Sequence, residues 1–167
     1  IAQAHAVDGV VLIDQNKALV GNVTPGDTAG FPVTLSRPGS YRLSGNLTAP
    51  AGTHGFLIAS PGVTLDLNGF TLASEGIGGT YPNGVFDGST VGNPIDQPRA
   101  EIRNGHIAGF YGAVNMQKSR AVVVENLRIL FPSASGTTIL VGPYSRVQRN
   151  IVDGRGYISS VCPSVVT

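Results

Sequence analysis

The chain has 167 residues, a formal net charge of +1 and 13% charged residues, about half the roughly 25% of an average soluble domain. Its 41% hydrophobic content excludes a disordered chain. Lacking both a basic cluster and an apolar run of about 18 residues, it is expected neither to bind nucleic acid nor to span a membrane. The 23 glycines and 11 prolines leave room for one short helix, at residues 14–20, in a chain of short strands.

The N-terminal residues 1–32 are predicted to form an arm and a capping segment, followed by one repetitive domain over 33–167. Ala2-Gln3-Ala4 is similar to the end of a signal peptide, which predicts a secreted, extracellular or cell-surface protein. A single cysteine, Cys162, excludes an internal disulfide framework. The three histidines are isolated in sequence, so no metal site or cofactor is expected. Asp87-Gly88-Ser89 matches only a fragment of a calcium loop, which leaves calcium as a weak alternative.

Asparagines return at a regular interval after short apolar runs. The steps between them are 22, 36, 22 and 24 residues, and a 14-residue insertion within a long loop at about 74–97 explains the one long step. Three short strands per 22-residue repeat predict an all-β fold, a parallel β-helix of about five coils. A sandwich of hairpins also has turns every 8–12 residues, but it does not explain a return at 22. The asparagines expected to stack inside one corner are Asn46, Asn68, Asn104, Asn126 and Asn150.

Three segments carry a family resemblance: residues 38–47, residues 62–72 (Gly-Val-Thr-Leu-Asp-Leu-Asn-Gly-Phe-Thr-Leu) and residues 102–110 (Ile-Arg-Asn-Gly-His-Ile-Ala-Gly-Phe). They resemble the rungs of bacterial right-handed parallel β-helix repeat proteins of the pectate-lyase-like superfamily, over about residues 33–160. The resemblance implies a right-handed coil. It does not specify a function, because that superfamily contains lyases, hydrolases, epimerases, tailspikes and proteins without known activity.

Charged residues are expected to line one outward file, meaning equivalent positions in successive coils. Asp66, Arg103, Glu125 and Arg149 would alternate in sign along it, which is typical of surface ion pairs that fix the register. The interpretation favoured here is therefore not enzymatic. If the chain is instead a polysaccharide lyase or glycoside hydrolase, the arginines would neutralise a uronate and a carboxylate or histidine would move the proton. The candidate catalytic residues are then Glu101, Arg103, His106, Glu125 and Arg128.

A carbohydrate-binding surface is predicted around the long loop, because aromatic side chains on a rigid scaffold stack well on sugar rings. The candidates are Tyr81, Phe86, Asp87, Asp96, Tyr111 and Tyr144.

Self-association is predicted from the two ends. The last coil stops before its expected asparagine and leaves unpaired strand edges, while an apolar strand near the N-terminus has no evident partner. Either the chain is a fragment of a longer β-helix, or a second copy covers the open end in head-to-tail multimers or filaments. The residues predicted at this contact are Val10, Val11, Leu12, Ile13, Tyr157, Ile158, Val161 and Cys162. The function expected is that of a structural, self-associating surface protein that also presents a carbohydrate-binding face.

Overall fold

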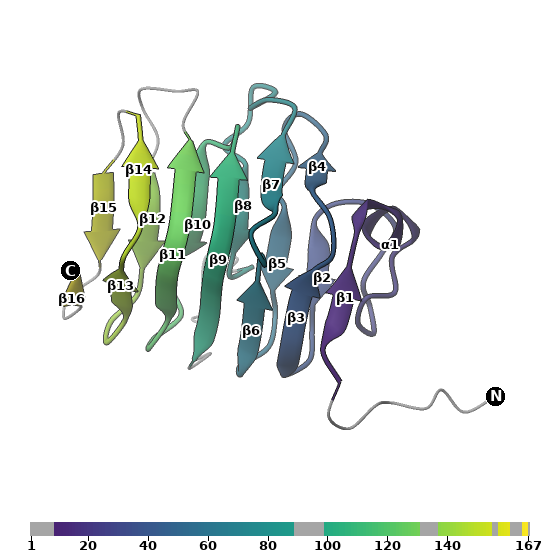
Figure 1. Ribbon diagram of the computed structural model, residues 1–167, viewed down its shortest axis with the longest axis horizontal. Helices are drawn as coiled ribbons and strands as arrows, with labels where there is room; N and C mark the ends of the chain where they lie inside the picture. Colours follow the sequence, from purple (N-terminus) through teal and green to yellow (C-terminus); the bar gives the residue numbers. More distant parts are fainter. Residues whose placement is uncertain (1–8, 89–98, 131–136, 155–156, 161–164, 167) are drawn as a thin grey trace.

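The structure is a computed structural model that describes residues 9–88, 99–130, 137–154, 157–160 and 165–166. Within them, the chain forms short strands and one helix (Figure 1). Sheet A contains β1 (Val11–Ile13), β3 (Gly39–Leu43), β4 (Leu47–Ala49), β6 (Val63–Asp66), β7 (Thr71–Ser74), β9 (Ala100–Ala108), β11 (Val123–Leu130), β13 (Arg146–Gln148), β14 (Ile151–Asp153) and β16 (Val165–Val166). Sheet B contains β2 (Val33–Leu35), β5 (Phe56–Ile58), β8 (Asn83–Phe86), β10 (Gly112–Met116), β12 (Thr137–Val141) and β15 (Tyr157–Ser160).

All strand pairs are parallel, and each strand pairs with its equivalent in the next coil. In Figure 1 the strands of sheet A run upward at the front, the chain crosses over the top to sheet B, and the coil advances to the left. This is the sense of a right-handed coil. The predicted parallel β-helix is therefore confirmed, as a solenoid of about 4 turns rather than about five.

The core lies between the two sheets and consists of stacked inward files. In sheet A one file runs through Tyr41, Leu65 and Ile102, and in sheet B another runs through Val33, Phe56 and Val85. All six side chains are at most 3% exposed. Burying a large apolar side chain contributes about 1.5–3 kcal/mol, so these files hold successive coils in register.

A short helix, α1 (Gln15–Val20), lies next to the first coil. Its N-cap is Asp14, whose Oδ1 accepts a hydrogen bond of 2.8 Å from the Lys17 backbone N–H, and the helix ends at Gly21 with a φ of 77°. Ala18 is fully buried against the core. The sequence prediction of a short helix at this position is confirmed.

The expected long loop at 74–97 contains a core strand. β8 pairs with β5 and β10, and Val85 within it is fully buried. The sequence analysis did not predict β8, because Asn83-Gly84-Val85-Phe86 lacks the usual polar and apolar alternation of a strand. Gly84 is needed there, since a Cβ atom would lie 2.7 Å from the Ala113 carbonyl oxygen of the next coil.

Candidate functional site

Two files of residues with left-handed backbone border part of sheet A. The first file, at the start of the strands, is Gly62, Arg99, Ala121 and Tyr144; the second, at a bend further along, is Asn68, Asn104, Asn126 and Arg149. All have φ between 52° and 72°. Such a conformation breaks the strict in-and-out alternation of a strand, so the chain turns a corner while the sheet continues. The strip of sheet between the corners carries the outward side chains considered below.

The asparagine corner is an external ladder. Asn126 Nδ2 donates to Asn104 Oδ1 at 3.2 Å, and Asn104 Nδ2 donates to Asp66 Oδ1 at 3.3 Å. Asn104 is half-buried, whereas Asn68 and Asn126 are exposed. These asparagines were expected inside the corner. At Asn126, however, the backbone is left-handed and the next residue, Leu127, points inward, so the Asn126 side chain lies on the surface.

The outer two asparagines of the predicted series occupy another position. Asn46 Oδ1 accepts from the Thr71 backbone N–H at 2.9 Å, and Asn150 Oδ1 accepts from the Leu127 backbone N–H at 2.9 Å. The turn residue equivalent to Asn126 in the last coil is Arg149, whose Nε donates to Asn126 Oδ1 at 3.0 Å. Asn46 and Asn150 each lie one or more residues after the bend position of their coil. The five asparagines therefore do not form one continuous stack, although they are spaced at similar intervals in the sequence.

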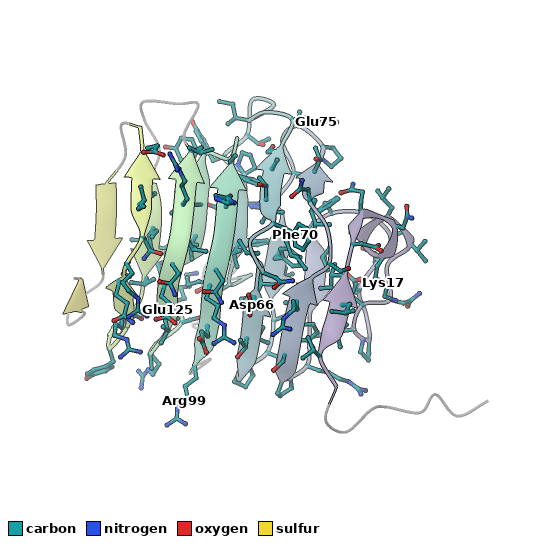
Figure 2. The ribbon with its side chains drawn as sticks, viewed as in Figure 1. Lys17, Asp66, Phe70, Glu75, Arg99 and Glu125 are labelled. Atoms are coloured by element: carbon teal, nitrogen blue, oxygen red, sulfur yellow. The ribbon has the colours of Figure 1, made fainter. Side chains whose placement is uncertain are left out.

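The predicted alternating charge file is present for three of its four members. Asp66 is in register with Arg103, and Arg103 with Glu125. The file begins with Arg42, which pairs in register with Asp66, and it continues from Glu125 to Gln148 rather than to Arg149. Figure 2 shows Asp66 and Glu125 at the same level of sheet A.

The arginine at the centre of this file binds carboxylates of its own and the preceding coil. Arg103 Nη1 lies 2.7 Å from Glu101 Oε1, and its Nε lies 3.5 Å from Asp66 Oδ2. Burial alone would lower the pKa of Arg103, but the neighbouring charges of Glu101 and Asp66 raise it. The guanidinium therefore stays charged and serves the ion-pair network of the sheet.

The other candidate catalytic residues are also engaged or lie apart. Glu125 Oε2 accepts from Arg149 Nη2 at 2.8 Å and from Gln148 Nε2 at 2.6 Å, and Arg128 Nη2 lies 2.7 Å from Asp153 Oδ2. His106 is half-buried and in register with Arg128. The predicted carboxylates are thus neutralised individually by cations, which is the arrangement expected of surface pairs rather than of a general acid and base.

The candidate binding residues fall into separate groups. Tyr81, which is 71% exposed, contacts Tyr111 edge to face at a centroid distance of 4.6 Å. Phe86 stacks on His54 at 4.1 Å, and His54 Nδ1 accepts from the Asn83 backbone N–H at 2.9 Å.

Of the two acidic candidates, only Asp87 lies among the described residues. The Asp87 carboxylate is buried and accepts backbone hydrogen bonds of 2.9 Å from Lys118 and 3.0 Å from Ser119. It therefore holds a turn of the next coil. Asp96 lies outside the described residues.

A groove lies along the left-handed corner that contains Tyr144. Its volume is ≈ 570 Å³, and its lining includes the half-buried apolar residues Ala121 and Val123 together with Glu101, which is paired with Arg103. Arg99, Arg146 and Tyr144 line its rim, and the Tyr144 side chain is 68% exposed. In Figure 2 the Arg99 side chain extends beyond the end of its strand.

Sequence reasoning missed Arg99 and Arg146 as candidate site residues. The available signal was in the sequence, because a proline directly precedes Gly62, Arg99 and Tyr144, which begin three coils. Proline followed by a left-handed residue is typical of a tight turn, so matching these dipeptides would have placed Arg99 and Tyr144 in one file.

The residues predicted for self-association are placed only in part. Val10 and Leu12 are 43% and 57% exposed, Val11 is half-buried and Ile13 is fully buried. This strand was expected to be spare, but it is β1 and pairs with β3 of its own chain. Its inward residue Ile13 belongs to the core, which explains why the strand is apolar. Tyr157 and Ile158 lie in β15, which pairs with β12, while Val161 and Cys162 lie outside the described residues.

Comparison of the chain with protein-family models, with curated proteins and with solved structures finds no match. No helix in the described part of the chain is long and apolar enough to cross a membrane. Among the same residues, no three histidine, cysteine, aspartate or glutamate side chains come together as metal ligands.

Proposed function

We propose that this chain is an extracellular β-solenoid that binds an acidic polysaccharide in the groove lined by Arg99, Tyr144 and Arg146. The resemblance of its rungs to the pectate-lyase-like superfamily supports a polysaccharide ligand, and its low content of charged residues supports secretion. The groove accounts for the ligand's charge, because it carries two arginines that form no ion pair with a carboxylate of the described residues.

The state of the arginines is the observation that carries this proposal. Across the described residues, neither Arg99 nor Arg146 forms a side-chain hydrogen bond or an ion pair, whereas Arg103, Arg128 and Arg149 are each paired with a carboxylate. A planar guanidinium binds a carboxylate in two-point contact. The two unpaired arginines therefore leave room for a carboxylate supplied by a ligand.

The remaining lining of the groove fits a sugar ring. The half-buried Ala121 and Val123 provide apolar surface, and the exposed ring of Tyr144 lies beside them. Sugar rings have an apolar face formed by their C–H groups, which packs on aromatic and aliphatic side chains while their acidic groups reach cations. Binding is favoured over cleavage, because Glu101 and Glu125, the candidate acid and base, are held by arginines.

Affinity electrophoresis through gels containing polygalacturonate or neutral dextran tests the proposal. The protein is expected to be retarded by polygalacturonate only. The double variant Arg99→Ala, Arg146→Ala is expected to lose about tenfold or more in affinity, since a hydrogen bond to a charged group is worth about 1.5–3 kcal/mol. Lys17→Ala, Arg37→Ala removes the same charge elsewhere and is the control. Equal retardation of both double variants, or none of the wild type, contradicts the proposal.

A further inference from the structure

At the N-terminal end of the solenoid, the three described strands β1, β2 and β4 each have a strand partner on one side only. Among the described strands, β2 pairs only with β5 and β4 pairs only with β7. The Val33 N–H and the Leu35 carbonyl point toward β5, where they bond Gly55 and Ala59. Thr34, between them, therefore directs its N–H and C=O away from the sheet, where another strand would pair.

Side chains of the preceding loop occupy this edge of β2. Asp27 Oδ1 accepts from the Thr34 N–H at 2.7 Å, and Thr24 Oγ1 donates to the Thr34 carbonyl at 2.6 Å. Thr24 Oγ1 also accepts from the Ser36 N–H at 3.0 Å. Both Thr24 and Asp27 are only 5% exposed. These three backbone groups are the ones that a further parallel strand would use.

The edge of β4 is closed in the same way by a single amide. Gln15 Oε1 accepts from the Thr48 N–H at 2.8 Å, and Gln15 Nε2 donates to the Thr48 carbonyl at 3.1 Å. A carboxamide carries the donor and acceptor of a peptide group, so Gln15 replaces one residue of a neighbouring strand. Thr48 is the central residue of the three-residue strand β4.

We propose that Gln15, Thr24 and Asp27 form a side-chain lock that keeps a strand of a second copy of this chain from pairing with β2 or β4. The edge of β3 at this end is covered by β1, which pairs only with β3 among the described strands and lies outside the lock. The lock thus closes the part of this end that β2 and β4 form, which is otherwise complementary to the chain's own strands. It opposes the head-to-tail assembly expected from the sequence, and it is independent of polysaccharide binding.

Opening the lock tests this inference. In the double variant Thr24→Val, Asp27→Ala, the β2 edge loses its side-chain partners, and size-exclusion chromatography with light scattering is expected to show a mass above the wild type that rises with concentration. Asn150→Ala is the matched control. It removes side-chain bonds to two backbone groups, the Leu127 N–H and the Val124 carbonyl, away from the N-terminal edges, and is expected to keep the wild-type mass. A folded double variant that keeps the wild-type mass at every concentration overturns the inference.

Hydrogen exchange provides a test that does not depend on the variant's folding. In the wild-type chain, the amides of Thr34, Ser36 and Thr48 are expected to be protected like those of the central strands. In Gln15→Ala, which affects only the β4 edge, the Thr48 amide is expected to exchange about tenfold faster or more while Thr34 stays protected. Exchange of these amides at unprotected rates in the wild type also overturns the inference.

Discussion

Asp66 joins more partners than any other outward residue of the charge file, and replacing it with alanine tests the network most severely. Its Oδ1 accepts from the Asn68 backbone N–H at 2.8 Å and from Asn104 Nδ2 at 3.3 Å. Its Oδ2 lies 3.7 Å from Arg42 Nη2 and 3.5 Å from Arg103 Nε. The Asp66→Ala substitution removes all four contacts at once.

The magnitude follows from the two kinds of contact. A short hydrogen bond to a charged acceptor contributes about 1.5–3 kcal/mol. Each ion pair contributes about 1 kcal/mol at most, because the Arg42 and Arg103 side chains are 43% and 33% exposed and water screens them. The loss from Asp66→Ala is therefore expected to be about 2–4 kcal/mol of unfolding free energy.

Urea unfolding followed by circular dichroism measures this loss as a shift of the midpoint. With a slope of about 1–3 kcal/mol/M, a shift of at least about 0.7 M is expected. Asp66→Asn is the control, because it keeps an oxygen acceptor for Asn68 and removes the charge, and it should cost less than half as much. A midpoint shift below about 0.3 M for Asp66→Ala would refute the stabilising role assigned to the four contacts of Asp66.

Two sets of substitutions and one change of pH test separate parts of the account. Exchanging Arg103 and Glu125 is expected to cost about 1–2 kcal/mol in urea unfolding, because the new glutamate at 103 faces two carboxylates. Burial lowers the pKa of His54 from its ordinary value of 6.5, so the unfolded chain binds a proton at a higher pH than the folded chain does. The unfolding free energy therefore falls as the pH drops through about 6.5. The urea midpoint is expected to be lower at about pH 5 than at about pH 7.5. Gly84→Ala is expected to lower the unfolding free energy by about 1–3 kcal/mol, because its Cβ would lie 2.7 Å from a carbonyl oxygen.

Each of these has its own control. For the charge exchange, Arg128 and Asp153 form an isolated pair whose exchange should be nearly neutral, and a neutral result for both exchanges would contradict the network. For the pH effect, His54→Gln should reduce the difference between the two pH values, and an unchanged difference would exclude His54 as its source. For the glycine, a Cβ at Gly45 meets only one atom, at 4.0 Å, so Gly45→Ala should leave stability nearly unchanged.

The repetitive part of the fold could be predicted from sequence because each coil repeats one physical constraint. Inward residues such as Leu65 and Ile102 must match the file above and below, which imposes the return at about 22 residues. The charge file followed from the same register, since Asp66, Arg103 and Glu125 each follow an inward residue. The prediction that Asn150 belongs to the same file as Asn126 was wrong. Asn150 lies one residue after the turn residue Arg149, and the spacing of asparagines in the sequence did not reveal this.

The groove and the N-terminal lock could not be predicted because they depend on contacts between different coils. Arg99 and Arg146 are recognised as unpaired only when the partners of the other arginines are known. Thr24 and Asp27 are ordinary loop residues in sequence, and only the direction of the Thr34 backbone gives them a role. The apolar β1 looked like a free strand because its pairing with β3 bridges about thirty intervening residues.

The most direct measurement of the central claim is an NMR titration of the protein with an oligogalacturonate. Binding in the proposed groove predicts saturable shifts of the Arg99 and Arg146 side-chain Nε–H signals and of the Tyr144 ring, with no such shifts on addition of a neutral oligosaccharide. Shifts confined to Tyr81 and Tyr111, or the absence of any saturable shift, would contradict the claim that the groove of sheet A binds acidic sugars.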